Sequence, residues 1–383
     1  MALDAKTGAV LWKVQAPMAA LSAPAISEGL IFVQGGYDCR SPSGVLAAFR
    51  AKDGAQLWQA PTAPSYSGFS LCSSESTPPA APGVVVAVGP PRGLAIMIRG
   101  LDPKSGGELW TASGSGPTSG AGSLLVFLQF LSGHSALQAL DPLTGQQRWL
   151  ANLTSAGPPI AVNGQSALVS GSYGQYGAQV SSVDLAAGSV RWQHQIGEGA
   201  VATVALSDVA AVDFTPLPSP TQSGPIVRSL IVLDGVTGKQ LWRRDKIVSV
   251  SPLPLFSTPG TVYLEQLPNP PGPSQCSFSI QALDSRSGTV RWTKSNIPGC
   301  ADPFYPGFAT DASTSVLMYP TRAATQIVAL DAKAGNKLWE QQLPQSAMCN
   351  TAGCQSAPVK ATIAGGVVYV AISGRFVYPQ GGE

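Results

Sequence analysis

The sequence is poor in charge and in histidine. Only 11% of its 383 residues are charged, and Lys+Arg 23 against Asp+Glu 21 leave a formal net charge of +2. A protein that binds nucleic acid through electrostatics carries a basic patch or stripe, so this even balance excludes that class of protein. The 2 histidines, His134 and His194, are far apart and have no second His or Cys at ligand spacing. We therefore expect no metal site.

The sequence also lacks a long hydrophobic run. The apolar stretch from Leu124 to Leu131 contains Gln129 and is far shorter than the ~20 residues that span a bilayer, so we expect no transmembrane segment. No charged segment followed by an apolar one opens the chain, and no signal peptide is visible. Hydrophobic residues nevertheless make up 44% of the chain, and Gly 42 and Pro 33 interrupt it throughout. This composition indicates a globular protein with a large core, built from β-strands and tight turns.

The tryptophans reveal an internal repeat. Successive tryptophans are 39 to 52 residues apart, and all of them end the same motif, as in ALDAKTGAVLW and ALDPLTGQQRW. A glycine lies four residues before every tryptophan, and an aspartate lies four residues before that glycine in all copies except the one with Arg50. The motif tryptophans are Trp12, Trp58, Trp110, Trp149, Trp192, Trp242, Trp292 and Trp339.

The motif predicts a β-hairpin, because two apolar stretches flank a short polar loop. The aspartate can cap the backbone amides of the turn, and glycine can adopt the positive φ that such a turn requires. Two residues before the aspartate stands a small residue in every copy but one, where it is Val232. A small residue on one strand leaves room for an indole on the neighbouring strand, and a flat ring with one N–H suits a joint between sheets.

Two further apolar runs precede each motif, as in Leu30–Val33 and Thr261–Leu264. Four short strands in 40 to 50 residues are typical of one blade of a β-propeller. We therefore predict an all-β fold, an eight-bladed β-propeller of four-stranded blades that forms a single domain over residues 1–383.

The chain ends are predicted to share one blade. The N-terminus supplies a motif hairpin without earlier strands, and the C-terminus supplies two strands, near Ala361–Ile363 and Val367–Val370, without a hairpin. Pairing them closes the propeller and removes the exposed sheet edges. Arg375–Tyr378 also has the pattern of a third strand and would compete with Met1–Leu3. Because the chain starts inside a repeat, we expect it to be a piece of a longer chain.

The A-x-D-x-x-T-G-x-x-x-W pattern resembles the tryptophan-docking motif of the PQQ-like β-propeller repeat family, in the quinoprotein alcohol dehydrogenase-like superfamily. This family includes eight-bladed quinoprotein alcohol dehydrogenases and the non-catalytic propeller lipoprotein of bacterial outer-membrane assembly. The resemblance covers essentially the whole chain, and it implies that each motif tryptophan stacks between neighbouring blades. Such a resemblance defines the fold better than the function, because one fold can carry many unrelated functional sites.

The catalytic members of that family hold PQQ between a tryptophan and a ring formed by two adjacent cysteines, with a Ca²⁺ and an aspartate base. This sequence has no Cys-Cys pair, no C-x-x-C-H haem motif, and no tryptophan outside the docking motif. We therefore expect no cofactor and no catalytic residue. PQQ and Ca²⁺ belong to the alternative reading, a divergent PQQ-dependent oxidoreductase that acts on alcohols or sugars.

Ligand-facing residues are expected where the second strand of a blade ends and the next loop begins, because these positions line one face of the axial funnel. Charge in such a place is costly unless it pairs or binds something. Pairing among these residues or exposure to solvent is the alternative explanation. The charged candidates are Asp38, Asp213, Glu265 and Arg322, and Gln34 and Gln129 occupy similar positions.

The cysteines are expected to form three disulfides. Loops on one face of the propeller would bring together Cys39 with Cys72 and Cys276 with Cys300, and Cys349 with Cys354 would close a small loop. Disulfides imply an oxidising compartment, so we expect a secreted or periplasmic protein. Six free thiols are the alternative.

These features together favour a non-catalytic, monomeric binding or scaffold protein. Its loop face would engage a protein or a carbohydrate, while the short motif turns lie on the opposite face. A bare structural repeat protein is a further alternative.

Overall fold

The structure is a computed structural model of the 383-residue chain, and it contains strands and turns but no helix among the residues that it describes. It follows that no helix in this part of the chain could span a membrane. The described residues are 1–18, 21–36, 44–62, 78–92, 95–114, 118–121, 124–131, 134–153, 157–173, 177–217, 226–249, 255–266, 277–298, 307–320, 324–344, 347–350, 353–356 and 359–372.

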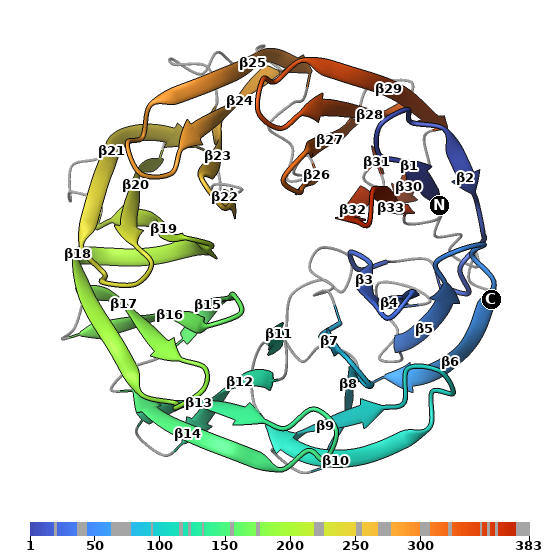
Figure 1. The fold of residues 1–383 in the computed structure, drawn as a ribbon, viewed down its shortest axis with the longest axis horizontal. Helices are drawn as coiled ribbons and strands as arrows, with labels where there is room; N and C mark the ends of the chain where they lie inside the picture. The colour runs from blue at the N-terminus through green and yellow to red at the C-terminus, as the bar shows by residue number, and fades with distance from the viewer. Residues whose placement is uncertain are drawn as a thin grey trace. The chain divides into compact units, whose positions relative to one another are not determined.

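The chain divides into two compact units, and the first contains residues 1–113, 302–331 and 336–383. Its repeating element is a four-stranded antiparallel sheet (Figure 1). The strands of these sheets are β26 (Gly307–Thr310), β27 (Thr314–Pro320), β28 (Ala324–Asp331) and β29 (Lys337–Pro344); β32 (Val359–Ala364), β33 (Val367–Ile372), β1 (Ala2–Asp4) and β2 (Val10–Trp12); β3 (Ala25–Ser27), β4 (Leu30–Gly36), β5 (Gly44–Arg50) and β6 (Gln56–Thr62); and β7 (Ala80–Ala81), β8 (Val84–Arg92), β9 (Ala95–Leu101) and β10 (Glu108–Gly114). A separate hairpin is formed by β30 (Ala347–Asn350) and β31 (Gly353–Ser356).

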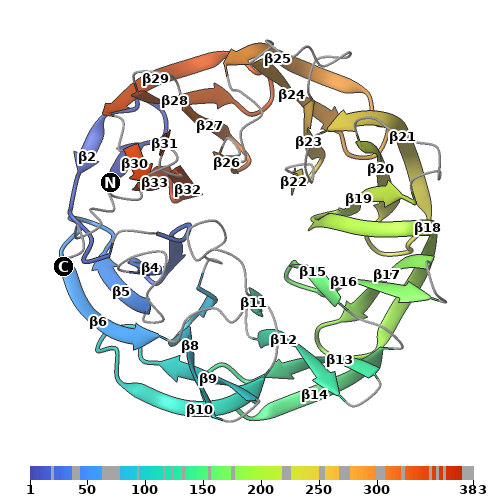
Figure 2. The ribbon, with the colours of Figure 1, turned by 180° about the vertical axis from the view of Figure 1, so that it is seen from behind.

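The second unit contains residues 114–301 and 332–335. It repeats the same sheet, and two of its sheets share one strand, β18 (Figure 2). The strands are β11 (Thr118–Ala121), β12 (Leu124–Leu131), β13 (His134–Leu140) and β14 (Gln147–Leu153); β15 (Gly157–Val162), β16 (Ser166–Tyr173), β17 (Gly177–Asp184) and β18 (Val190–Leu206); β19 (Val209–Pro216), β20 (Ile226–Asp234) and β21 (Gln240–Ser249); and β22 (Leu255–Thr258), β23 (Thr261–Gln266), β24 (Ser277–Asp284) and β25 (Val290–Pro298).

The expected pairing of the two chain ends is present in the first unit. β1 pairs antiparallel with β33, with Ala2 opposite Tyr369, and β2 completes that sheet on the outside. β18 differs from expectation, because the predicted connection between two repeats is here one continuous strand of 17 residues. Gly197 and Gly199, with φ values of 141° and 149°, lie in its middle, where side chains are disfavoured.

Each motif forms the hairpin of the third and fourth strands, as its pattern predicts. In the first copy Oδ1 of Asp4 accepts hydrogen bonds from the amides of Lys6 and Thr7, at 3.1 and 2.8 Å, and Gly8 has a φ of 73°. The Thr7 hydroxyl also donates to this oxygen, at 2.8 Å, and this bond together with the amide bonds holds the pKa of Asp4 below its ordinary value. The small motif residue lies directly opposite the tryptophan, as Ala2 does opposite Trp12.

The tryptophans join successive sheets within each unit. In the second unit Nε1 of Trp192 donates to the carbonyl of Gly235, the residue after the next motif aspartate. A Cβ built on Gly238 would lie 2.5 Å from the Trp192 ring, so the indole packs directly on the motif glycine of the next sheet. Equivalent bonds to the next turn are made by Trp12, Trp58, Trp149, Trp242, Trp292 and Trp339.

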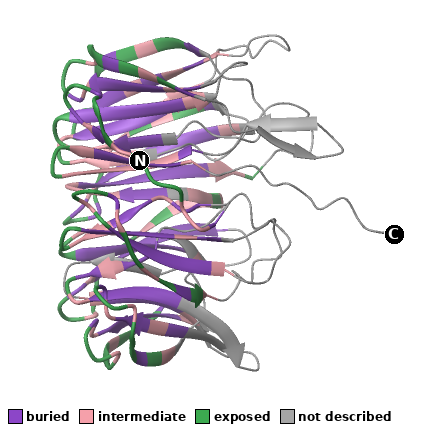
Figure 3. Cartoon of the chain, turned by 90° about the vertical axis from the view of Figure 1, so that its right-hand side faces the viewer, coloured by how far each residue is buried: buried purple, intermediate pink, exposed green. Residues whose placement is uncertain are grey.

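The core lies between neighbouring sheets. Because side chains alternate along a strand, each sheet buries apolar residues on both faces. In β19, Val209 and Ala211 pack with Val262 of the following sheet, whereas Ala210 and Val212 join the cluster of the preceding sheet. Figure 3 shows buried residues along the strands and exposed ones at the turns.

Candidate functional site

Three of the residues selected from the sequence occupy one register position in their sheets. Asp213 lies opposite Leu230, Glu265 opposite Ile280, and Gln34 opposite Leu46. In each sheet the opposite residue lies four residues before the first residue of the motif turn, which is Asp234, Asp284 or Arg50. The sequence pattern therefore identified truly equivalent sites in three second strands.

The other selected residues do not join this set. Gln129 lies opposite Ala136, one residue out of the register, so its side chain lies on the other face of its strand. Asp38 and Arg322 lie outside the described residues.

Asp213 is part of a buried ion pair. Its Oδ2 lies 2.8 Å from Nη1 of Arg228 on the neighbouring strand β20, and the two side chains are 0% and 5% exposed. Alternation along the strands places both on the face that packs against the β22–β25 sheet, where Leu230 and Leu264 belong to one cluster. A buried charge is costly unless it is paired. As folded, Asp213 therefore neutralises Arg228 inside the protein and does not reach the surface.

Glu265 has a different environment. It is partly buried near the end of β23, and this burial raises the pKa of its carboxyl to about 7. Because Leu264 packs in the cluster that faces Asp213, the side chain of Glu265 lies on the opposite face of the sheet. The two carboxyl groups therefore do not converge on one space, although their strands are equivalent.

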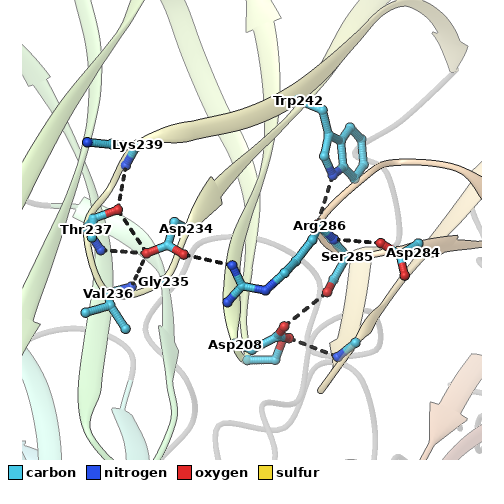
Figure 4. A network of polar contacts seen from close by, with 12 residues as sticks. Asp208, Asp234, Gly235, Val236, Thr237, Lys239, Trp242, Asp284, Ser285 and Arg286 are labelled. Carbon is cyan, nitrogen blue, oxygen red and sulfur yellow. Dashed lines mark hydrogen bonds and ion pairs between the residues drawn. The ribbon is translucent and has the colours of Figure 1, made fainter.

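The turns of the second unit carry a cross-sheet polar network that the sequence reasoning missed (Figure 4). Asp208, between β18 and β19, accepts hydrogen bonds from the amide of Gly260 at 3.0 Å and from Oγ of Ser285 at 3.1 Å. Arg286 reaches back to Asp234, with Nη1 3.2 Å from Oδ2. Arginine at the third turn position, unique among the motif copies, was the available signal. The network joins adjacent sheets through their turns.

The described residues contain no group of three His, Cys, Asp or Glu that could hold a metal ion. The three predicted disulfides involve six cysteines. Cys39, Cys72, Cys276 and Cys300 lie outside the described residues. The backbones of Cys349 and Cys354 are directly opposite in the β30–β31 hairpin, and the disulfides stay predictions.

The first unit contains a cavity of about 260 Å³ that the sequence reasoning also missed. It lies between the sheet that joins the chain ends and the β3–β6 sheet. Its described lining residues are mostly apolar, and among them Lys13 has the one charged side chain. The lining includes Lys13, Ala16, Ile31, Val33, Phe49 and Val370–Ile372.

The repeated four-stranded sheets and the tryptophan hairpins define a β-propeller repeat protein of the PQQ-like class. The chain belongs to the family described as outer membrane protein assembly factor BamB, whose pattern matches residues 1–126, 133–267 and 276–379. No curated protein matches the chain by sequence.

Solved structures of low sequence identity share the fold. Quinohemoprotein alcohol dehydrogenase from Comamonas testosteroni is 13% identical, with a TM-score of 0.57, over 100% of this chain and 77% of that one. BamB from Moraxella catarrhalis is 14% identical, with a TM-score of 0.51, over 91% of this chain and 95% of that one. These similarities establish the fold, which is shared by an enzyme and by a protein named for assembly.

The side chains described here do not fit a quinone site built as in the quinoprotein dehydrogenases. Seven of the eight indoles donate their N–H to a carbonyl of the next sheet and pack on its turn. If one of these indoles moved to stack under a quinone, the contact between two neighbouring sheets would be lost. Among the described residues, the fully buried carboxylate of Asp213 is already paired with Arg228.

Proposed function

We propose that this protein is a non-catalytic β-propeller scaffold that binds a protein partner. The observation that carries the proposal is the use of the tryptophans, because seven of the eight donate their N–H to a carbonyl of the next sheet and hold sheet to sheet. The family description, an assembly factor, supports the same class of function. A carbohydrate is the second candidate ligand.

We infer further that all the sheets form a single closed eight-bladed propeller over residues 1–383. The pairing of β1 with β33 supports closure, because it leaves neither chain end as a free sheet. The loop face, with Asp38, Glu265 and Arg322, is our candidate contact face. Asp213 would stabilise the sheet behind it through its buried ion pair with Arg228. We expect a monomer, placed outside the cytoplasm and stabilised by the three predicted disulfides.

The competing function is a divergent PQQ-dependent oxidoreductase. A direct test incubates the purified protein with PQQ, Ca²⁺, alcohols or sugars, and an artificial electron acceptor. We expect no dye reduction above that of a heat-unfolded sample. PQQ-dependent reduction that is lost in Glu265→Gln would establish the oxidoreductase instead.

The binding function needs a positive result as well. The tagged full chain, crosslinked in its native host, should yield a stoichiometric protein partner whose crosslinks map to one face. A control variant must keep the fold, so Trp192→Ala, which loosens the contact between two sheets, is unsuitable. Leu338→Ala, an exposed residue on the outer strand β29, keeps the fold and serves as the matched control. Absence of any crosslinked protein would overturn the proposal.

A further inference from the structure

The outer strand β21 carries an unusual concentration of positive charge. Residues 239–246 contain four cations and one carboxylate, that of Asp245, a surplus of three positive charges in a chain whose formal net charge is +2. The four cations, which we call the basic strip, are Lys239, Arg243, Arg244 and Lys246. β21 is the last strand of its sheet, and three of the four side chains are exposed. Among the outer strands that the structure describes, no other contains more than two cations.

The protein itself neutralises only part of this charge. Nε of Arg243 lies 2.6 Å from Oδ1 of Asp245. The other three cations of the strip have no ion pair within the described part of the chain. The segments of the second unit that lie outside the described residues contain no Asp or Glu, so they cannot supply the missing carboxylates. The strip therefore keeps an uncompensated positive charge.

Arg244 is held in place without being neutralised. Its Nη1 donates to Oε1 of Gln281 at 2.7 Å, and its Nη2 donates to the carbonyl of Gly288 at 3.3 Å, both in the next sheet. Both acceptors are neutral. Burial lowers the pKa of this partly buried guanidinium, which means that water solvates its charge poorly. A carboxylate beside it would meet a cation that is already oriented, and orientation in advance reduces the cost of binding.

Lys246 occupies a backbone conformation that does not favour lysine. Its φ is 59°, in the left-handed region. The cause is a β-bulge, in which Asp245 and Lys246 together lie opposite Ser229. The next sheet has a bulge at the equivalent position, where Asn296 has a φ of 57°. Asparagine tolerates this conformation better than lysine. The backbone therefore does not explain the lysine, and strained residues of this kind gather at functional sites.

We propose that the basic strip binds an acidic, extended segment of the protein partner, aligned along β21. The proposal rests on the proposed function and names the chemistry of the partner. At roughly 3.3 Å a residue, the strip is about 23 Å long and matches seven to eight extended residues. Complementary charge of this kind fixes the register of a partner and speeds its association.

A nucleic acid fits the strip less well than an acidic peptide. Proteins that bind DNA make roughly 6–10 phosphate contacts, whereas the strip offers four cations. The carboxylate of Asp245, 54% exposed, lies within the strip and would repel a continuous phosphate backbone. A peptide can place an uncharged residue opposite this carboxylate.

The probe is a fluorescein-labelled peptide of eight residues, four repeats of Glu-Thr. Its carboxylates share one side when the chain is extended, because side chains alternate. Fluorescence anisotropy with the full chain should show saturable binding that weakens as sodium chloride is added. The matching Gln-Thr peptide should not bind. A labelled single-stranded DNA of eight nucleotides should bind more weakly than the Glu-Thr peptide at the same salt concentration.

Variants of the strip should change the affinity in both directions. Lys239→Gln with Lys246→Asn should weaken peptide binding about tenfold, and its melting temperature should not fall, because asparagine relieves the strain at position 246. Asp245→Asn keeps an oxygen for Arg243, removes the competing carboxylate and should strengthen binding. Lys104→Asn, at an exposed turn of the first unit, is the matched control for the loss of one charge and should bind as the parent does.

Other outcomes overturn the proposal. These are absence of saturable binding, equal affinity of the parent and the double variant, or an equal loss in Lys104→Asn and Lys246→Asn, which would show an effect of net charge alone. Tighter binding of the oligonucleotide than of the peptide would assign the strip to nucleic acid instead. If the crosslinked partner binds the double variant as well as the parent, the strip is refuted while the proposed scaffold function remains.

Discussion

The carboxylate of Asp213 and the guanidinium of Arg228 form an ion pair, 2.8 Å apart, in a part of the protein that solvent does not reach. The two residues are on neighbouring strands of one sheet, and their shared face packs on the next sheet. A pair in this position stabilises the fold only as a pair, because each charge alone would be buried without compensation.

Asp213→Asn should therefore lower the free energy of unfolding by about 3–5 kcal/mol, since it leaves the Arg228 charge buried. The double variant Asp213→Leu with Arg228→Met should recover most of this loss, because apolar residues of similar size often replace a buried pair without cost. Urea denaturation followed by fluorescence measures both. A loss below about 1 kcal/mol for Asp213→Asn would show that Arg228 reaches another anion.

Trp192→Ala should cost roughly 3–5 kcal/mol, because it leaves a large cavity at the joint between two sheets. The indole is 9% exposed and bonded to the Gly235 carbonyl. Trp192→Phe keeps most of the ring and should lose less. Leu338→Ala, 42% exposed, is the control and should stay within about 0.5 kcal/mol of the parent. Equal stability of Trp192→Ala and the parent would contradict the packing role.

Two glycines separate backbone strain from crowding. Gly29 and Gly238 have φ values of 75° and 70°, but an added Cβ meets nothing within 4 Å at Gly29 and lies 2.5 Å from the Trp192 ring at Gly238. Gly29→Ala should cost about 1 kcal/mol from the positive φ alone. Gly238→Ala should cost clearly more, because the indole must move. Similar melting temperatures of the two variants would refute the close contact.

The raised pKa of Glu265 makes stability depend on pH. Its folded value is about 7 and its ordinary value is 4.5, so between these pH values the folded protein holds the proton more tightly than the unfolded chain. The free energy of unfolding should therefore fall as pH rises from about 4.5 to about 7. Glu265→Gln should match the parent near pH 4 and exceed it at pH 8. A constant difference between the two across this range would argue against a buried carboxyl.

The turn network predicts unequal effects of two charged residues. Asp208→Ala removes hydrogen bonds to Gly260 and Ser285 of the next sheet, and each bond is worth about 0.5–1.5 kcal/mol. Arg286→Ala removes a pair in which the arginine is 61% exposed, and such surface pairs contribute about 0–1 kcal/mol. Thermal unfolding should rank Asp208→Ala as the more damaging change. A larger loss of stability in Arg286→Ala would mean that the Arg286–Asp234 pair, and not Asp208, holds the two sheets together.

The hairpins were predictable because their causes are local. The aspartate cap, the glycine with positive φ and the small residue opposite the tryptophan all act within the motif itself, as Asp4, Gly8 and Ala2 show. Spacing alone then indicated four strands per repeat. The continuous strand β18 was not foreseen, because residues 197–199 have the glycine pattern of a turn and only pairing with β17 and β19 extends them.

The candidate site was only partly predictable, for a physical reason. The sequence by itself determined the β-hairpin repeat, the register of the second strands and the equivalence of Asp213 and Glu265. Only the tertiary structure decided what those charges meet, since the partner of Asp213 lies 15 residues away on another strand and burial depends on the next sheet.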